Sequence, residues 1–154
     1  MSRVVVNEIE AKVGNDITFN DTVKIDTIKG KTTAGSVTVQ GEGTATTNLQ
    51  QGLTKFWANW DGTGTVSLRD SFNLTTLTDQ GTGDYSCTFT NAMANRGYVH
   101  TANCGSGSGH IALLYSYAQN LTYRCRTYVI EESGSSPGVT DEALVVSEVS
   151  GDLA

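Results

Sequence analysis

The sequence lacks a basic cluster, a long apolar run and any closely spaced cysteine pair, and each absence excludes a class of protein. Lysine and arginine total 10 against 16 acidic residues, and the net charge is −6, so binding to a nucleic-acid backbone is not expected. No window approaches the roughly 18 apolar residues of a transmembrane helix, so membrane insertion is not expected either. The apolar run at residues 4–6 is too short for a signal peptide.

The three cysteines are an odd number and include no C-x-x-C pair, so a zinc knuckle is not expected. Cys87, Cys104 and Cys125 each stand in a strand-like context. We expect three free thiols that pack as small hydrophobic side chains. The alternatives are a Cys104–Cys125 or Cys87–Cys125 bridge, or a bridge between chains.

Glycine and threonine take up much of the composition, with 17 and 22 residues respectively. Threonine is β-branched and favours strands, whereas glycine supplies turns. Short apolar–polar segments separated by turn residues predict an all-β protein whose residues 55–154 form an antiparallel β-sandwich. The expected strands are residues 55–60, 64–69, 71–77, 84–90, 97–103, 110–117, 121–130 and 142–149.

The first part of the chain differs from the rest. Residues 7–19 and 26–39 are approximate copies of one pattern, in which an isoleucine precedes a glycine turn and an alternating strand. Each copy has too few apolar residues for its own core, so residues 1–43 are expected to be a β arm or shaft that packs against neighbouring chains. A flexible arm or an ordinary hairpin is the alternative. Residues 44–54 are expected to be a linker, either with a helical turn capped by Asn48 or already extended from Leu53.

Few residues suggest chemistry, and we expect no catalytic residue, cofactor or metal. His100 and His110 could meet across a hairpin or a threefold axis and hold a metal, but histidines near loops are usually solvated. The candidates for a pair of carboxylates that hydrolyses a glycoside are Asp61, Asp70, Asp79 and Asp84. Three of them, Asp61, Asp79 and Asp84, stand beside glycines, where turns need such side chains for local hydrogen bonds.

Aromatic side chains are the better candidates for surface contact. Trp57 and Trp60 are three residues apart, so they should point to opposite faces of a strand, one into the core and one outward. The side chains selected as possible surface contacts are Trp57, Trp60, Tyr115, Tyr117 and His110. The loops at residues 103–110 and 131–141 are further positions for contact with a partner.

Residues 56–149 resemble the small β-sandwich module that closes many tail fibres and spikes of tailed bacteriophages. The matching residues are Trp57, Trp60, Asp61-Gly62-Thr63-Gly64-Thr65-Val66, Arg69, Ser71-Phe72-Asn73, Leu77-Thr78-Asp79, Gly81-Thr82-Gly83-Asp84-Tyr85, Phe89, Met93 and Tyr98. Residues 4–43 are similar to shaft or adaptor pieces of such fibres. Only two shaft-like repeats are visible, which favours a short fibre, a tail-tip protein or a capsid-surface protein over a long fibre.

The resemblance implies a non-enzymatic virion structural protein of short tail fibre or spike type, made in the host cytoplasm and displayed on the virion surface. It implies a homotrimer that attaches to other virion proteins through residues 1–43 and exposes its sandwich to a host-surface glycan or protein. A capsid decoration or cement protein that stabilises the head is the alternative, and a small polysaccharide-degrading spike is a third. Neither nucleic acid nor a membrane is an expected partner.

Overall fold

The computed structural model describes residues 22–30, 37–40, 44–49, 52–105, 110–114, 120–131 and 138–154, and these contain strands and no helix. The all-β class predicted from the composition is therefore confirmed. The strands are β1 (Thr38–Gln40), β2 (Thr46–Asn48), β3 (Thr54–Asp61), β4 (Ser67–Phe72), β5 (Leu74–Gly81), β6 (Asp84–Phe89), β7 (Val99–Cys104), β8 (His110–Leu114), β9 (Arg124–Glu131), β10 (Gly138–Val139) and β11 (Val145–Ser150).

The described N-terminal part contains one short hairpin. Strands β1 and β2 pair antiparallel, with Val39 opposite Thr47. The strand expected around Val37–Val39 is thus present, and its partner lies within the segment expected to be a linker. The first of the two repeat copies, residues 7–19, lies outside the described residues. The chain is already extended from Thr54, as the second alternative for this segment predicted.

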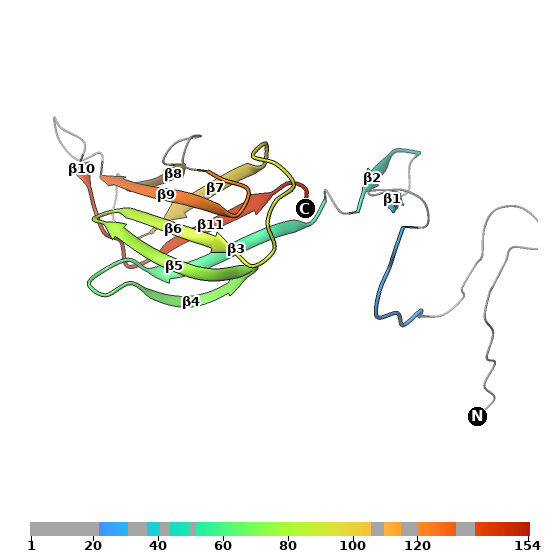
Figure 1. Ribbon diagram of the computed structural model, residues 1–154, viewed down its shortest axis with the longest axis horizontal. Coiled ribbons are helices and arrows are strands. Elements are labelled where there is room, and N and C mark those ends of the chain that lie inside the picture. The colour runs from blue at the N-terminus through green and yellow to red at the C-terminus, as the bar shows by residue number, and fades with distance from the viewer. Residues whose placement is uncertain are drawn as a thin grey trace, which may run out of the picture.

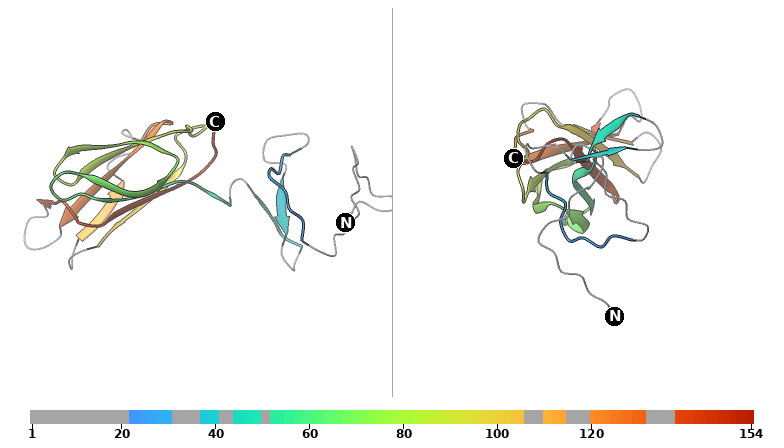
Figure 2. Two further views of the ribbon diagram at one scale, coloured as in Figure 1. Left: turned by 90° about the horizontal axis from the view of Figure 1, so that it is seen from below. Right: turned by 90° about the vertical axis from the view of Figure 1, so that its right-hand side faces the viewer.

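The rest of the described chain forms two antiparallel sheets (Figure 1). One sheet has the order β4-β3-β11-β7, and the other has the order β10-β9-β6-β5, with β8 also paired to β9. The further views in Figure 2 show the two layers from below and from one end. The C-terminus lies at the end of the sandwich from which the N-terminal segment leads away, so the glycine turns between β3 and β4 and between β5 and β6 lie at the far end.

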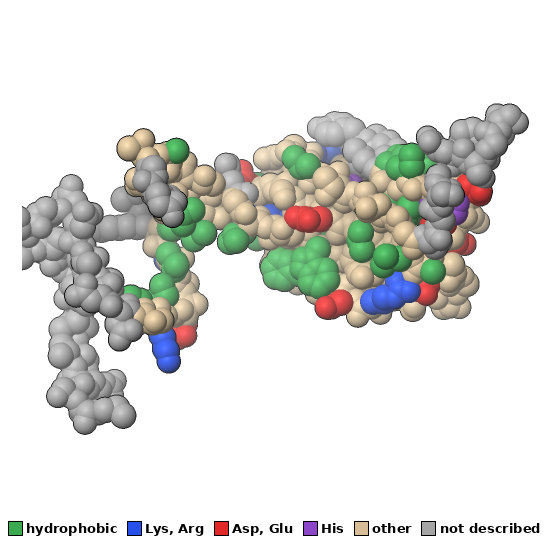
Figure 3. Space-filling view, turned by 180° about the vertical axis from the view of Figure 1, so that it is seen from behind, with side chains coloured by type: hydrophobic (Ala, Val, Ile, Leu, Met, Phe, Trp, Pro, Cys, Tyr) green, Lys and Arg blue, Asp and Glu red, His purple; other side chains and the backbone are tan. Residues whose placement is uncertain are grey.

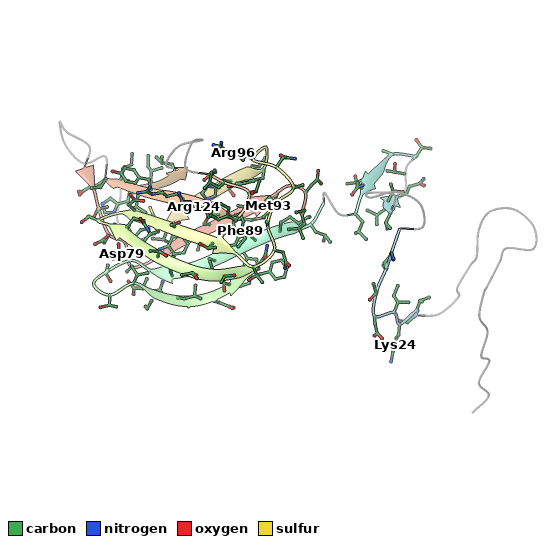
Figure 4. All side chains as sticks on the ribbon, viewed as in Figure 1. Lys24, Asp79, Phe89, Met93, Arg96 and Arg124 are labelled. Carbon is green, nitrogen blue, oxygen red and sulfur yellow. The ribbon has the colours of Figure 1, made fainter. Side chains whose placement is uncertain are left out.

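The core lies between the two sheets because alternate side chains of each strand point inward. In β3 these are Phe56, Ala58 and Trp60, all at most 1% exposed. The ring centroids of Phe56 and Phe89 lie 5.0 Å apart, and those of Trp60 and Tyr85 lie 5.6 Å apart, so aromatic pairs join β3 to β6 across the layers. Phe89 and Met93 are seen among the packed side chains in Figure 4, whereas Lys24 lies in the N-terminal segment. Each buried large apolar side chain contributes about 1.5–3 kcal/mol to stability.

The two glycine turns meet at Tyr85. Its hydroxyl donates a hydrogen bond to Oδ1 of Asp141 at 2.8 Å, and that same oxygen accepts the backbone N–H of Gly83 at 2.7 Å. The N–H of Gly62 donates to the carbonyl of Glu142 at 2.8 Å. Burial, followed by the hydrogen bond to Asp141, raises the pKa of Tyr85 above its ordinary value, so its hydroxyl stays protonated. The glycine motifs therefore hold the end of the sandwich together.

The turn between β4 and β5 lies at Asn73, not at Asp70 as the expected strand limits implied. Asn73 adopts a left-handed backbone with a φ of 61°, which asparagine tolerates better than most residues. Its side-chain amide donates to the carbonyls of Lys55 and Asn91 at 2.8 and 3.0 Å, and its Oδ1 accepts the N–H of Asn91. The side chain thus joins three segments, and Asp70 falls inside β4.

The three cysteines are free thiols, as the sequence predicted. Cys87 and Cys125 are fully buried and stand directly opposite each other on β6 and β9. Cys104 lies on β7, in the other sheet, and is partly buried.

Candidate binding groove on the outer sheet face

The outer face of the four-stranded sheet carries an open groove of about 520 Å³. It runs along β11 and is bordered by β3 and β7, and we call it the outer-face groove. Figure 3 shows this side of the molecule from behind, where hydrophobic side chains form a patch with acidic side chains on either side of it. The outward-pointing residues that line the groove are Trp57, Asn59, Thr101, Asn103, Val146 and Glu148.

The strand register places these six side chains in two rows across the sheet. Glu148 stands between Trp57 of β3 and Thr101 of β7. Val146 stands between Asn59 and Asn103 in the same way. The rows are neighbours because residues two apart on a strand point to the same face. One aromatic ring, two amides, one hydroxyl and one carboxylate therefore share a single surface.

Hydrogen bonds fix the polar side chains of the groove. The hydroxyl of Thr54 donates to Oε1 of Glu148 at 2.6 Å, which holds the carboxylate beside Trp57. Oδ1 of Asn103 accepts the backbone N–H of Cys104 at 2.8 Å. Oδ1 of Asn59 lies 3.5 Å from the guanidinium of Arg69. Each amide oxygen therefore accepts one hydrogen bond from the protein, and each amide NH₂ group carries two N–H donors.

Trp57 and Trp60 lie on opposite faces of β3, as their spacing predicted. Trp57 is 36% exposed and borders the groove, next to Phe72 of β4, which stands opposite it and is 51% exposed. Trp60 is fully buried against Tyr85. It is a core residue, and its side chain has no surface to offer a partner.

The other side chains selected for surface contact lie away from the groove or outside the described residues. His110 begins β8, where its Nδ1 pairs with the buried carboxylate of Glu142 and its Nε2 lies 3.8 Å from Oε1 of Glu131. Tyr115 and Tyr117 fall outside the described residues. The two loops proposed for contact are described only at their edges.

The two histidines have separate partners. Nε2 of His100 lies 2.7 Å from Oγ of Ser147 beneath the groove, whereas His110 is held by acidic side chains. Among the described residues, no group of three or more histidine, cysteine or acidic side chains is placed to hold a metal ion.

The four aspartates considered for hydrolysis have local roles. Asp61 accepts from the backbone N–H and hydroxyl of Thr63 and pairs with Arg69 at 2.9 Å, and the hydrogen bonds from Thr63 lower its pKa. Asp79 and Asp70 each accept a nearby backbone N–H, from Gly81 and Ser71 respectively. Asp84 is nearly buried and receives Nε of Arg126 at 2.6 Å.

Of the outward-pointing groove residues, the sequence predicted a surface contact for Trp57. It did not predict the other five, which are Asn59, Thr101, Asn103, Val146 and Glu148. The alternation along β7 and β11 predicts which side chains point outward. It gives no sign that β11, near the end of the sequence, lies between β3 and β7.

In the part of the chain that is described, no helix is long and apolar enough to cross a membrane. No family model, curated protein or solved structure matches this chain.

Proposed function

We propose that the protein is a non-enzymatic structural protein of a bacteriophage virion, of the short tail fibre or spike type, whose sandwich contacts the host surface. The observation that carries the proposal is the outer-face groove, an open site on the four-stranded sheet where Trp57 is 36% exposed. The resemblance of residues 56–149 to fibre-closing modules supports it. So does the exposure of apolar side chains in the N-terminal segment, which suits attachment to other chains.

The arrangement of the chain also supports this role. The C-terminus and the start of β3 lie at one end of the sandwich, next to the N-terminal segment (Figure 1). A domain attached at that end leaves its sheet faces and its far turns available to a partner. Three of the aspartates considered for hydrolysis, Asp61, Asp79 and Asp84, serve turns or ion pairs, which favours binding over catalysis.

The test is where the protein sits on a particle and whether it competes for the host. Antibodies against the chain should label the tail or its tip in electron micrographs of the phage that encodes it. Purified protein added to host cells should reduce adsorption of that phage, without releasing reducing sugar from host polysaccharide. Label over the head together with unchanged adsorption would instead establish a decoration protein.

A further inference from the structure

The outer-face groove contains an aromatic surface of the kind that stacks on a sugar ring. The indole of Trp57 is 36% exposed although its strand is central in the sheet, and Phe72 lies beside it in register. Aromatic faces contribute binding energy by covering apolar C–H surface, and they lose little conformational entropy because they have few rotatable bonds. A ligand with one apolar face and polar edges would fit against Trp57.

The polar side chains around Trp57 match the hydroxyl groups at the edges of such a ligand. Asn59 and Asn103 offer amide N–H donors, the carboxylate of Glu148 accepts, and the hydroxyl of Thr101 can do either. These groups are held by strand register and by hydrogen bonds to the protein, so little ordering is needed on binding. A second copy of the chain is the alternative occupant, and the oligomeric state of the Trp57→Ala variant below tests for it.

The charges on this surface favour an uncharged ligand. Glu148 is the charged side chain that lines the groove, and no lysine, arginine or histidine lines it among the residues that the structure describes. Arg69, near the edge, already pairs with Asp61 and donates to the carbonyl of Trp60 at 2.8 Å. An acidic sugar would therefore meet the carboxylate of Glu148, whereas the guanidinium of Arg69, which lies beside Asn59, is already paired with Asp61.

We propose that the outer-face groove binds an uncharged glycan, with Trp57 stacked on a pyranose ring and Asn59, Asn103 and Glu148 bonded to its hydroxyls. The inference rests on the proposed function, because it names the class of host-surface molecule that the sandwich would contact. It commits to an uncharged saccharide over an acidic one.

The experiment measures binding of short oligosaccharides to the full chain by calorimetry and by acrylamide quenching of tryptophan fluorescence. Chitotriose, cellotriose and maltotriose serve as uncharged probes, and trigalacturonate serves as the acidic probe. We expect at least one uncharged probe to bind at millimolar concentration and to protect Trp57 from quenching. Trp60 is fully buried, so the quenching that the probe suppresses is that of Trp57. Trigalacturonate should not bind.

Three variants test the roles of the groove residues. Trp57→Ala should weaken binding at least about tenfold, the effect of removing an aromatic anchor, and Trp57→Phe should weaken it less. Glu148→Gln should remove the barrier to trigalacturonate. Tyr123→Ala is the matched control, because Tyr123 is also an exposed aromatic residue, at 50%, but lies before β9 in the other sheet. Circular dichroism and thermal melting establish that each variant is folded.

Several outcomes would overturn the inference. These are failure of every uncharged probe to bind, tighter binding of trigalacturonate than of the uncharged probes, or full affinity in both Trp57 variants. Loss of oligomers in Trp57→Ala would show that the groove is a subunit contact.

The proposed function fails separately. If a glycan binds at Trp57 but antibodies do not label virions, the virion role is wrong and the glycan site stands. If the wild-type protein and the Trp57→Ala variant block adsorption equally, the glycan site is wrong and the virion role stands.

Discussion

At the scale of single residues, the place of a residue within its sheet decides its accessibility. Cys87 and Cys125 stand on the inner strands β6 and β9 and are fully buried, whereas Cys104 also faces the core but ends the edge strand β7 and is partly exposed. The hydrogen bond between Cys87 and Cys125, followed by burial, raises the pKa of Cys87. Burial, followed by the nearby charge of Glu142, raises the pKa of Cys104. Solvent access therefore separates Cys104 from the other two thiols, and ionisation does not, because the pKa of Cys87 is raised as well.

We predict that a thiol reagent such as DTNB modifies one cysteine of the native protein and all three in denaturant. Cys104→Ser should abolish the native reaction. Because the thiolate is the reactive form and the pKa of Cys104 is raised, the rate of modification should continue to increase above about pH 8.5, where an ordinary thiol is half ionised. Fewer than three thiols in denaturant would reveal a disulfide, and two or more reactive thiols in the native state would contradict the burial of Cys87 and Cys125.

At the scale of elements, the turns between strands are fixed by how closely two backbones approach. A Cβ added to Gly62 would lie 2.2 Å from the hydroxyl oxygen of Tyr85. A Cβ added to Gly83 would lie 2.5 Å from the carbonyl oxygen of Val129, and the φ of Gly83 is +63°. Gly64 has nearly the same φ, +62°, with no atom within 4 Å of the added Cβ.

We predict that Gly83→Ala destabilises the protein by more than Gly64→Ala, although the two share a left-handed backbone. Gly64→Ala should cost about 1–2 kcal/mol, the strain of a left-handed alanine. Gly83→Ala adds a clash with two backbone carbonyls, and we expect about 1–3 kcal/mol more, the usual cost of overpacking. Urea unfolding followed by circular dichroism measures both, with Gly62→Ala as a steric test without positive φ. Equal losses for Gly83→Ala and Gly64→Ala would contradict the close approach seen here.

The strands could largely be predicted from the sequence because their signals are local. Alternation and glycine turns located β3, β6 and β9 to within a few residues, and the spacing of Trp57 and Trp60 gave their opposite faces. The β4–β5 turn was misplaced because Asn73 reverses the chain without a neighbouring glycine. The groove was not predictable, since it depends on β11 pairing with both β3 and β7, and nothing within any one of these segments records that pairing.

At the scale of the whole molecule, the N-terminal segment and the sandwich differ in how they bury apolar side chains. The sandwich has its own core between two sheets. In the described N-terminal residues, by contrast, large apolar side chains are exposed: Val23 at 46%, Ile25 at 60%, Ile28 at 58% and Val39 at 49%. The β1–β2 hairpin has three residues in each strand, and an isolated two-stranded hairpin is marginally stable at best in water.

We predict that these apolar side chains are covered by other copies of the chain, and that the 154-residue chain is a trimer by light scattering. The double variant Ile25→Ser, Ile28→Ser should dissociate to monomers with an unchanged melting temperature of the sandwich, because neither residue belongs to its core. Ile111→Ser is the matched control: Ile111 is 39% exposed on β8, so its loss should leave the trimer intact. A chain that is monomeric in dilute solution would contradict the prediction. Dissociation of the Ile111→Ser variant instead would place the subunit contact on the sandwich.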